Sequence, residues 1–284
     1  MSTVTTPTSP KAWGPDVQAL SPEGVIPESV LIEATSRVAT VEGDAPSVRI
    51  PAINLEPDTG FVAEGANINE AEPDLSEMVL NTGKVACLVK LSREQLEQPN
   101  ATKTVTDEIN RAMVSRVNFA LLQQAAPVAP AAWPPAGLLV HATGGGVVTD
   151  NLDVIVDAVA AIEELGGSAT HILAAPSAWA ALNKLKMFDS VDDTGAQSNA
   201  SLLGSGTVAA QRTLLNVPVM STVGMPTKSL LVLDKRMTLS AYGPLNVAVS
   251  NDFYFGSDNV AVRATIRFGA GFSKAGAGVK LTVA

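Results

Sequence analysis

Residues 61–92 read FVAEGANINEAEPDLSEMVLNTGKVACLVKLS, an acidic, turn-rich half followed by an apolar half. Carboxylates without His, Cys or Lys at working spacing do not make a catalytic loop, and no Lys or Arg stands in this stretch before Lys84. The segment therefore predicts a structural projection that is not a catalytic site. Its five acidic residues are Glu64, Glu70, Glu72, Asp74 and Glu77.

The residues around this stretch predict a hairpin. The sequence VRIPAINL at 48–55 is typical of a strand, PDTG at 57–60 favours a turn, and LVKLS at 88–92 is typical of the returning strand. A two-stranded hairpin is at best marginally stable in water. We therefore expect the segment between Leu55 and Leu91 to lie on another surface.

Composition limits the function further. A chain of 284 residues suffices for about two domains, and 46% hydrophobic with only 4% aromatic residues predicts a core of Ala, Val, Leu and Ile. The formal net charge of −9 argues against a protein that grips nucleic acid by neutralising phosphates. No apolar window is long enough for a membrane span, and no secretory pattern opens the chain.

The residues that often carry chemistry are isolated. Cys87 lies in VACLVKL and is expected to be a small buried hydrophobic residue, while His141 and His171 have no second ligand nearby and are interpreted as structural. The glycines 144–146 lack both the GxGxxG spacing and a P-loop lysine, so a surface turn is favoured over a phosphate site. We expect no enzyme activity, cofactor or metal.

The remaining elements follow in a definite order. Residues 1–24 are rich in Thr, Ser and Pro and predict an arm that becomes ordered on a neighbouring copy. Residues 104–125 predict one long helix, with a capping box at Thr104 and Asp107 and an Asp107–Arg111 pair. Its expected apolar stripe is Val105, Ile109, Ala112, Met113, Val117, Ala120 and Leu121.

The Pro-rich segment 127–135 marks a boundary, after which the pattern alternates between strand and helix. We expect a strand at 137–142, a turn at 143–146, a strand at 170–175 and a helix at 177–186. Between them, residues 150–167 predict a helix with Leu152, Ile155, Val156, Val159 and Ile162 along one face. From Leu230 onward the pattern is that of strands, with Arg263 and Arg267 on the opposite face from Val260, Val262, Ala264, Ile266 and Phe268.

This order of parts resembles the major capsid protein of tailed bacteriophages with the Hong Kong 97 fold, an α+β class. The resemblance is carried by residues 60–98 as the extended loop, HILAAPSAWAALNKLK at 171–186 as an axial strand and helix, and LLNVPVMST at 214–222 with DNVAVRATIRFG at 258–269 as closing segments. It implies four parts. They are an N-terminal arm at 1–46, the extended loop and spine helix at 47–126, an axial domain at 127–226, and the peripheral return at 227–284.

The resemblance also implies a function and partners. Such a protein self-assembles as pentamers and hexamers into an icosahedral head, located in the virion and assembled in the host bacterial cytoplasm, which encloses double-stranded DNA without sequence-specific binding. Separate scaffolding, portal and decoration proteins are candidate partners, and the lack of a long helical segment before Ser47 favours a separate scaffold. Some family members join a loop lysine to a neighbouring asparagine by an isopeptide bond, but no Lys lies between Arg49 and Lys84.

In this fold the extended loop reaches across the neighbouring subunit, so its carboxylates would face basic groups of the next copy. The candidate arginines are Arg93, Arg111, Arg116, Arg263 and Arg267. The alternative, that these acids are merely solvated, stays open because exposed ion pairs contribute only ~0 to 1 kcal/mol each.

Two other functions remain as alternatives. An encapsulin nanocompartment shares the fold but encloses a cargo enzyme, and the Thr/Pro-rich start argues against the amphipathic helix with which encapsulins usually begin. A soluble α/β enzyme that binds a nucleotide at the Gly144 turn would be a monomer or a small oligomer.

Overall fold

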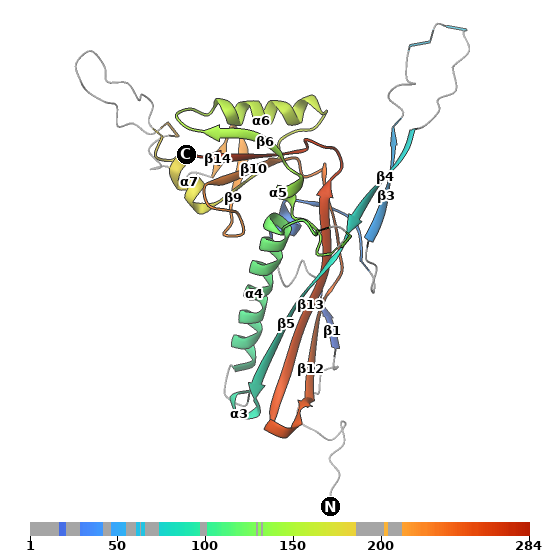
Figure 1. Cartoon of the computed structure of the whole chain (residues 1–284), viewed down its shortest axis with the longest axis vertical. Helices are drawn as coiled ribbons and strands as arrows, with labels where there is room; N and C mark the ends of the chain where they lie inside the picture. Colours follow the sequence, from blue (N-terminus) through green and yellow to red (C-terminus); the bar gives the residue numbers. More distant parts are fainter. Residues whose placement is uncertain are drawn as a thin grey trace, which may run out of the picture.

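A computed structural model gives the arrangement of the chain (Figure 1). It describes residues 17–20, 29–41, 47–54, 61–62, 64–65, 74–96, 101–128, 130–131, 133–185, 202–203 and 212–284. Two of the predicted loop carboxylates, Glu70 and Glu72, and most of the predicted arm lie outside the described residues.

The long body of the molecule is a sheet with a helix along it (Figure 1). The helix α4 (Ala101–Gln123) buries Ile109, Met113, Val117 and Leu121 at helical spacing, so one stripe faces the sheet. The strands, in spatial order, are β1 (Val17–Leu20), β12 (Leu245–Tyr254), β13 (Asn259–Phe272), β11 (Thr238–Tyr242) and β2 (Ser36–Ala39), with β5 (Gly83–Ser92) paired to β13.

A second sheet lies at one end of this body, beside the helices α6 (Asp153–Glu164) and α7 (Pro176–Leu182) (Figure 1). Burial of Ile172, Leu173 and Leu230–Leu233 shows that its central strands form the core there. The strands, in spatial order, are β6 (Thr143–Val148), β14 (Gly278–Val283), β10 (Ser229–Leu233), β7 (His171–Ala174), β9 (Val217–Ser221) and β8 (Thr213–Leu214). The short elements elsewhere are α2 (Val30–Glu33), α3 (Arg93–Leu96), α5 (Leu138–His141) and the 3-10 turn η3 (Phe255–Ser257).

A hairpin of β3 (Ser47–Asn54) and β4 (Asp74–Asn81) projects from the body (Figure 1). Its register runs from Ser47 opposite Asn81 to Asn54 opposite Asp74, and these strands pair only with each other among the described residues. Residues 88–92 are a strand as expected, but they do not close the hairpin: they are the end of β5, which pairs with β13 along its whole length. The strand that closes the hairpin is β4, which begins at Asp74 in the acidic half of the quoted stretch and packs Met78 and Leu80 inward at its base.

Buried hydrogen bonds join the N-terminal part of the chain to the body. Ser29 Oγ donates to Asn118 Oδ1 at 3.1 Å, and the Val30 amide donates to the same oxygen at 3.0 Å. Ser29 also caps α2, whose Val30 and Leu31 are buried in the main core. Residues 29–41 therefore belong to the folded body. This differs from the expectation of an arm that extends to residue 46.

Two local expectations differ from the structure between residues 137 and 148. The strand expected at 137–142 is the short helix α5, and the glycine turn expected at 143–146 is the strand β6. β6 pairs in parallel with β14 through a bulge at Gly145, where a Cβ would lie 2.5 Å from side-chain atoms of Val279 and Leu281. The glycines therefore allow close packing of a strand and do not form a phosphate-binding turn.

The two longest helices differ from expectation in detail. α4 begins at Ala101, so Thr104 lies inside the helix and cannot cap it, and Arg111 pairs with Glu108 in place of Asp107. Ala112 and Val156 are exposed, whereas Leu122 and Ala158 are buried, because each buried stripe is set by the sheet that the helix meets.

The division expected at residue 226 does not separate the two sheets. β10 and β14, which follow that position, pair with β7 and β6 of the preceding segment. β11, β12 and β13 lie between them in sequence and belong to the other sheet. The chain therefore crosses between the two sheets more than once after residue 226.

Candidate inter-subunit surface

One face of the long sheet carries four cationic side chains, which we call the basic face: Lys84 and Lys90 of β5 with Arg263 and Arg267 of β13. Lys84 is opposite Arg267 in the register, and Arg263 is opposite Leu88. Because side chains alternate along a strand, Val85, Cys87, Val89 and Leu91 point to the other face and pack on the core. The paired positions of β5, β13 and β12 place no Asp or Glu on the basic face.

Local contacts hold parts of the basic face in place. The ammonium of Lys90 lies 4.8 Å from the ring centroid of Tyr254, and Arg267 Nη1 donates to Thr82 Oγ1 at 3.2 Å. Lys84, Lys90 and Arg263 are exposed, whereas Arg267 is half-buried. The predicted placement of Arg263 and Arg267, opposite the buried Val260–Phe268 row, is confirmed.

The other predicted arginines lie elsewhere and have partners in the same chain. Arg93 Nε is 3.0 Å from Asp258 Oδ1, and the guanidinium of Arg116 lies 5.1 Å from the ring centroid of Phe119. Arg111 Nη2 donates to Glu108 Oε2 at 2.6 Å, which raises the pKa of Arg111 above its ordinary value. The structure therefore does not gather the five arginines into one cluster.

The acidic residues are also distributed along the hairpin. Glu77 is expected to face a basic group of another copy, but it has a partner in its own chain: Arg49 Nη1 of the adjacent strand lies 3.1 Å from Glu77 Oε1. Both side chains are mostly exposed, so this pair adds little stability. Asp74 opens β4 at the far end of the hairpin, and Glu64 lies in an exposed turn beyond it.

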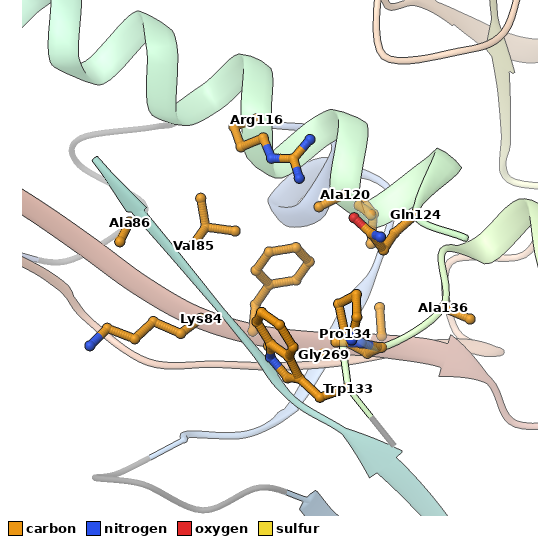
Figure 2. A pocket seen from close by; sticks show the side chains of 15 residues that line it. Lys84, Val85, Ala86, Arg116, Ala120, Gln124, Trp133, Pro134, Ala136 and Gly269 are labelled. Carbon is orange, nitrogen blue, oxygen red and sulfur yellow. The ribbon is translucent and has the colours of Figure 1, made fainter. Parts of the chain in front are cut away.

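A pocket of about 380 Å³ lies where the start of β5 meets the C-terminal part of α4 (Figure 2). Arg116 and Ala120 of α4 border one side, and Trp133 and Pro134 border the other (Figure 2). Phe268 and Gly269 of β13 complete the lining. The pocket is therefore mainly apolar, with the cationic side chain of Arg116 at its border, whereas the ammonium of Lys84 extends away from Arg116 (Figure 2).

The candidate chemical residues stay apart. His171 is half-buried beside Thr170, and its burial, together with the charge of Lys235, lowers its pKa, while Glu33 acts in the opposite direction. His141 is exposed, and Cys87 is half-buried against the core. Among the described residues no group of His, Cys, Asp and Glu could hold a metal ion, and no helix is long and apolar enough to cross a membrane.

The sequence matches the family described as the Phage capsid family over residues 24–283. This chain belongs to the phage capsid family. The match covers most of the 284 residues, so the resemblance to phage capsid proteins inferred from the sequence is confirmed. No curated protein sequence matches the chain.

Solved structures show the same fold for this phage capsid family member. A chain from Gordonia phage Cozz has a TM-score of 0.68 at 14% identity and covers 90% of this chain and 86% of its own. A chain from Microbacterium phage Oxtober96 has a TM-score of 0.69 at 15% identity, covering 100% and 96%. The capsid of a native GTA particle has a TM-score of 0.63 at 19% identity, covering 89% of each chain.

The basic face of this capsid-family protein includes two residues that the sequence pattern did not single out, Lys84 and Lys90. Their alternation with Val85 and Val89 places both lysines on one side of a strand. What the sequence could not supply is the pairing of that strand with β13, which brings them beside Arg263 and Arg267.

Proposed function

We propose that this protein is the major capsid protein of a tailed phage, with the Hong Kong 97 fold. Its copies form the pentamers and hexamers of an icosahedral shell around double-stranded DNA. Family membership and the mixed α+β architecture support the shell function. The observation that carries the finer proposal is the projecting β3–β4 hairpin, whose strands pair only with each other among the described residues.

A two-stranded ribbon of this kind gains most of its stability by contact with something else. The same chain offers a complementary surface, because its hairpin region carries Glu64, Glu70, Glu72 and Asp74 while its basic face carries four cations. We assign these acids to the basic face of the next copy, with the arginines Arg263 and Arg267 as the main partners. Each exposed pair contributes at most ~1 kcal/mol, but a closed shell repeats it in every subunit.

Enclosure of DNA agrees with the charge of the chain. A formal net charge of −9 disfavours tight phosphate binding, so DNA could enter and leave such a shell without being held by its wall. Scaffolding, portal and decoration proteins remain candidate partners, assembly is placed in the host cytoplasm, and we assign the protein no catalytic role.

Electron microscopy of particles that contain this chain, combined with an assay of their nuclease-protected nucleic acid, tests the proposal. The expected result is an icosahedral shell with double-stranded DNA in the filled particles. A shell that holds a cargo enzyme and no DNA would favour the nanocompartment. A monomer or small oligomer at all concentrations would overturn the shell assignment.

A further inference from the structure

The pocket beside Trp133 is suited to one kind of occupant. Apolar groups from Trp133, Pro134 and Phe268 line it, the guanidinium of Arg116 borders it, and no Asp or Glu is among its lining residues. Trp133 is 62% exposed, which leaves much of a large ring uncovered. An apolar group followed closely by a carboxylate would match both the lining and the charge.

The hairpin region offers such a group. Phe61 is fully exposed, Val62 is 47% exposed, and Glu64 is exposed three residues after Phe61. A phenyl ring typically buries 150–250 Å² on docking, and the pocket has a volume of about 380 Å³ in which a ring could bury such an area. The carboxylate of Glu64 supplies the charge opposite to that of Arg116.

The pocket is not filled by the hairpin of its own copy. Gly83 of the lining follows Asn81, which closes the base of the hairpin, whereas Phe61 comes after Asn54 at the far end. The seven residue steps from Asn81 to Asp74 correspond to roughly 24 Å of strand. Phe61 is not among the lining residues and is fully exposed, so an occupant of this sequence must come from another copy.

We infer that Phe61 of one copy docks in the Trp133 pocket of a neighbouring copy, with Glu64 beside Arg116. This inference rests on the proposed function, because it requires a second copy at the end of the hairpin. It adds a specific aromatic anchor to the charge pairing proposed for the basic face. Central aromatic anchors carry a large share of the binding energy at protein interfaces.

Substitutions in the expressed full chain test the anchor. Phe61→Ala should lower shell yield by about tenfold or more, the effect expected of a hot-spot residue. Ala120→Phe, which fills the pocket from α4, should do the same while the unassembled subunit keeps its circular dichroism spectrum. Phe253→Ala is the matched control, because Phe253 is a 67% exposed aromatic residue of β12 outside the pocket.

The charges give a second test. Arg116→Glu and Glu64→Arg should each reduce yield, and the double variant should recover at least part of it.

The outcomes separate the inference from the proposed function. Normal shells from Phe61→Ala, or equal losses from Phe61→Ala and Phe253→Ala, overturn the anchor and leave the shell function standing. Failure of the double variant Arg116→Glu with Glu64→Arg to recover any yield also overturns it. If wild-type subunits form no shell and no particle contains the chain, the proposed function fails and the inference fails with it.

Discussion

Lys84 of β5 and Arg267 of β13 are direct register partners across an antiparallel pair, so two like charges face each other on one side of the sheet. Like charges directly opposite each other in a sheet are destabilising. Thr82 accepts a hydrogen bond from Arg267, and among the described residues no carboxylate forms an ion pair with Lys84. A carboxylate supplied by another copy would relieve the repulsion.

Reversing the acidic charges of the loop should prevent shell formation. In the triple variant Glu70→Lys, Glu72→Lys and Asp74→Lys, attraction to the basic face becomes repulsion, while the subunit core stays unchanged. We expect folded subunits by circular dichroism and few shells by electron microscopy. High salt should weaken wild-type shells in the same direction, since the screening length falls from ~10 Å at 0.1 M to ~3 Å at 1 M.

The matched control for the triple-Lys variant reverses charges on the basic face. Arg263→Glu combined with Lys90→Glu should also prevent assembly alone and should restore part of it when mixed with triple-Lys subunits. Shells of normal yield and thermal stability from the triple-Lys chain would mean that the carboxylates are only solvated and that apolar and backbone contacts hold the hairpin.

The shell should contain no covalent cross-link between subunits. The segment between Arg49 and Lys84 has no Lys, so an isopeptide bond from the loop has no amine there. Boiled particles should give one gel band near 29.3 kDa. A ladder of multimers that survives boiling and reductant would contradict this expectation.

Removal of the N-terminal arm should affect assembly more than folding. Deleting residues 1–16 should leave the unfolding midpoint of the subunit unchanged and lower shell yield. Deleting residues 1–24 also removes β1, which pairs with β12 from Val17 to Leu20, and should lower the midpoint by a few degrees, about 2–4 °C per kcal/mol for a domain of this size. Aggregation of the shorter deletion as a monomer would show that the arm is part of the core.

Asn118 should be essential for stability of the subunit. Asn118→Ala leaves Ser29 and the Val30 amide without the buried oxygen that accepts from both, which should cost about 1–3 kcal/mol in the free energy of unfolding. Asn110→Ala, on a less buried part of the same helix, is the control and should have a small effect. Urea denaturation of the two variants measures the difference, and equal values would contradict the role assigned to Asn118.

Subunit stability should depend on His171 in mildly acidic solution. Burial lowers the pKa of His171 in the folded state, so its contribution is present above the unfolded pKa of about 6.5 and is lost as pH falls through the lower folded value. The free energy of unfolding should therefore decrease from pH 7 towards pH 5.5. His171→Gln should flatten this dependence, and His141→Gln, at an exposed site, should not.

The sequence alone determined those features that depend on the periodicity of neighbouring residues. The stripe of Ile109, Met113, Val117 and Leu121 predicts a helix because residues three and four apart share one side, and alternation in 259–268 predicts which way Arg263 points. The order of such elements sufficed for the resemblance to phage capsid proteins, which the family match confirms. These features need no knowledge of which element meets which.

Only the tertiary structure decided the pairings. Residues 88–92 look like the return of the hairpin, yet β5 pairs with β13, some 170 residues later, while β4, which begins at the acidic Asp74, closes the hairpin. Gly144–Gly146 looks like a turn, but close contact with Val279 and Leu281 of β14 makes it a strand. In each case a contact distant in sequence overrides the local preference, because the strand pairing it provides outweighs the small free-energy differences between local conformations. The basic face depends on the same long-range pairing, since Lys84 and Arg267 become neighbours only when β5 and β13 meet.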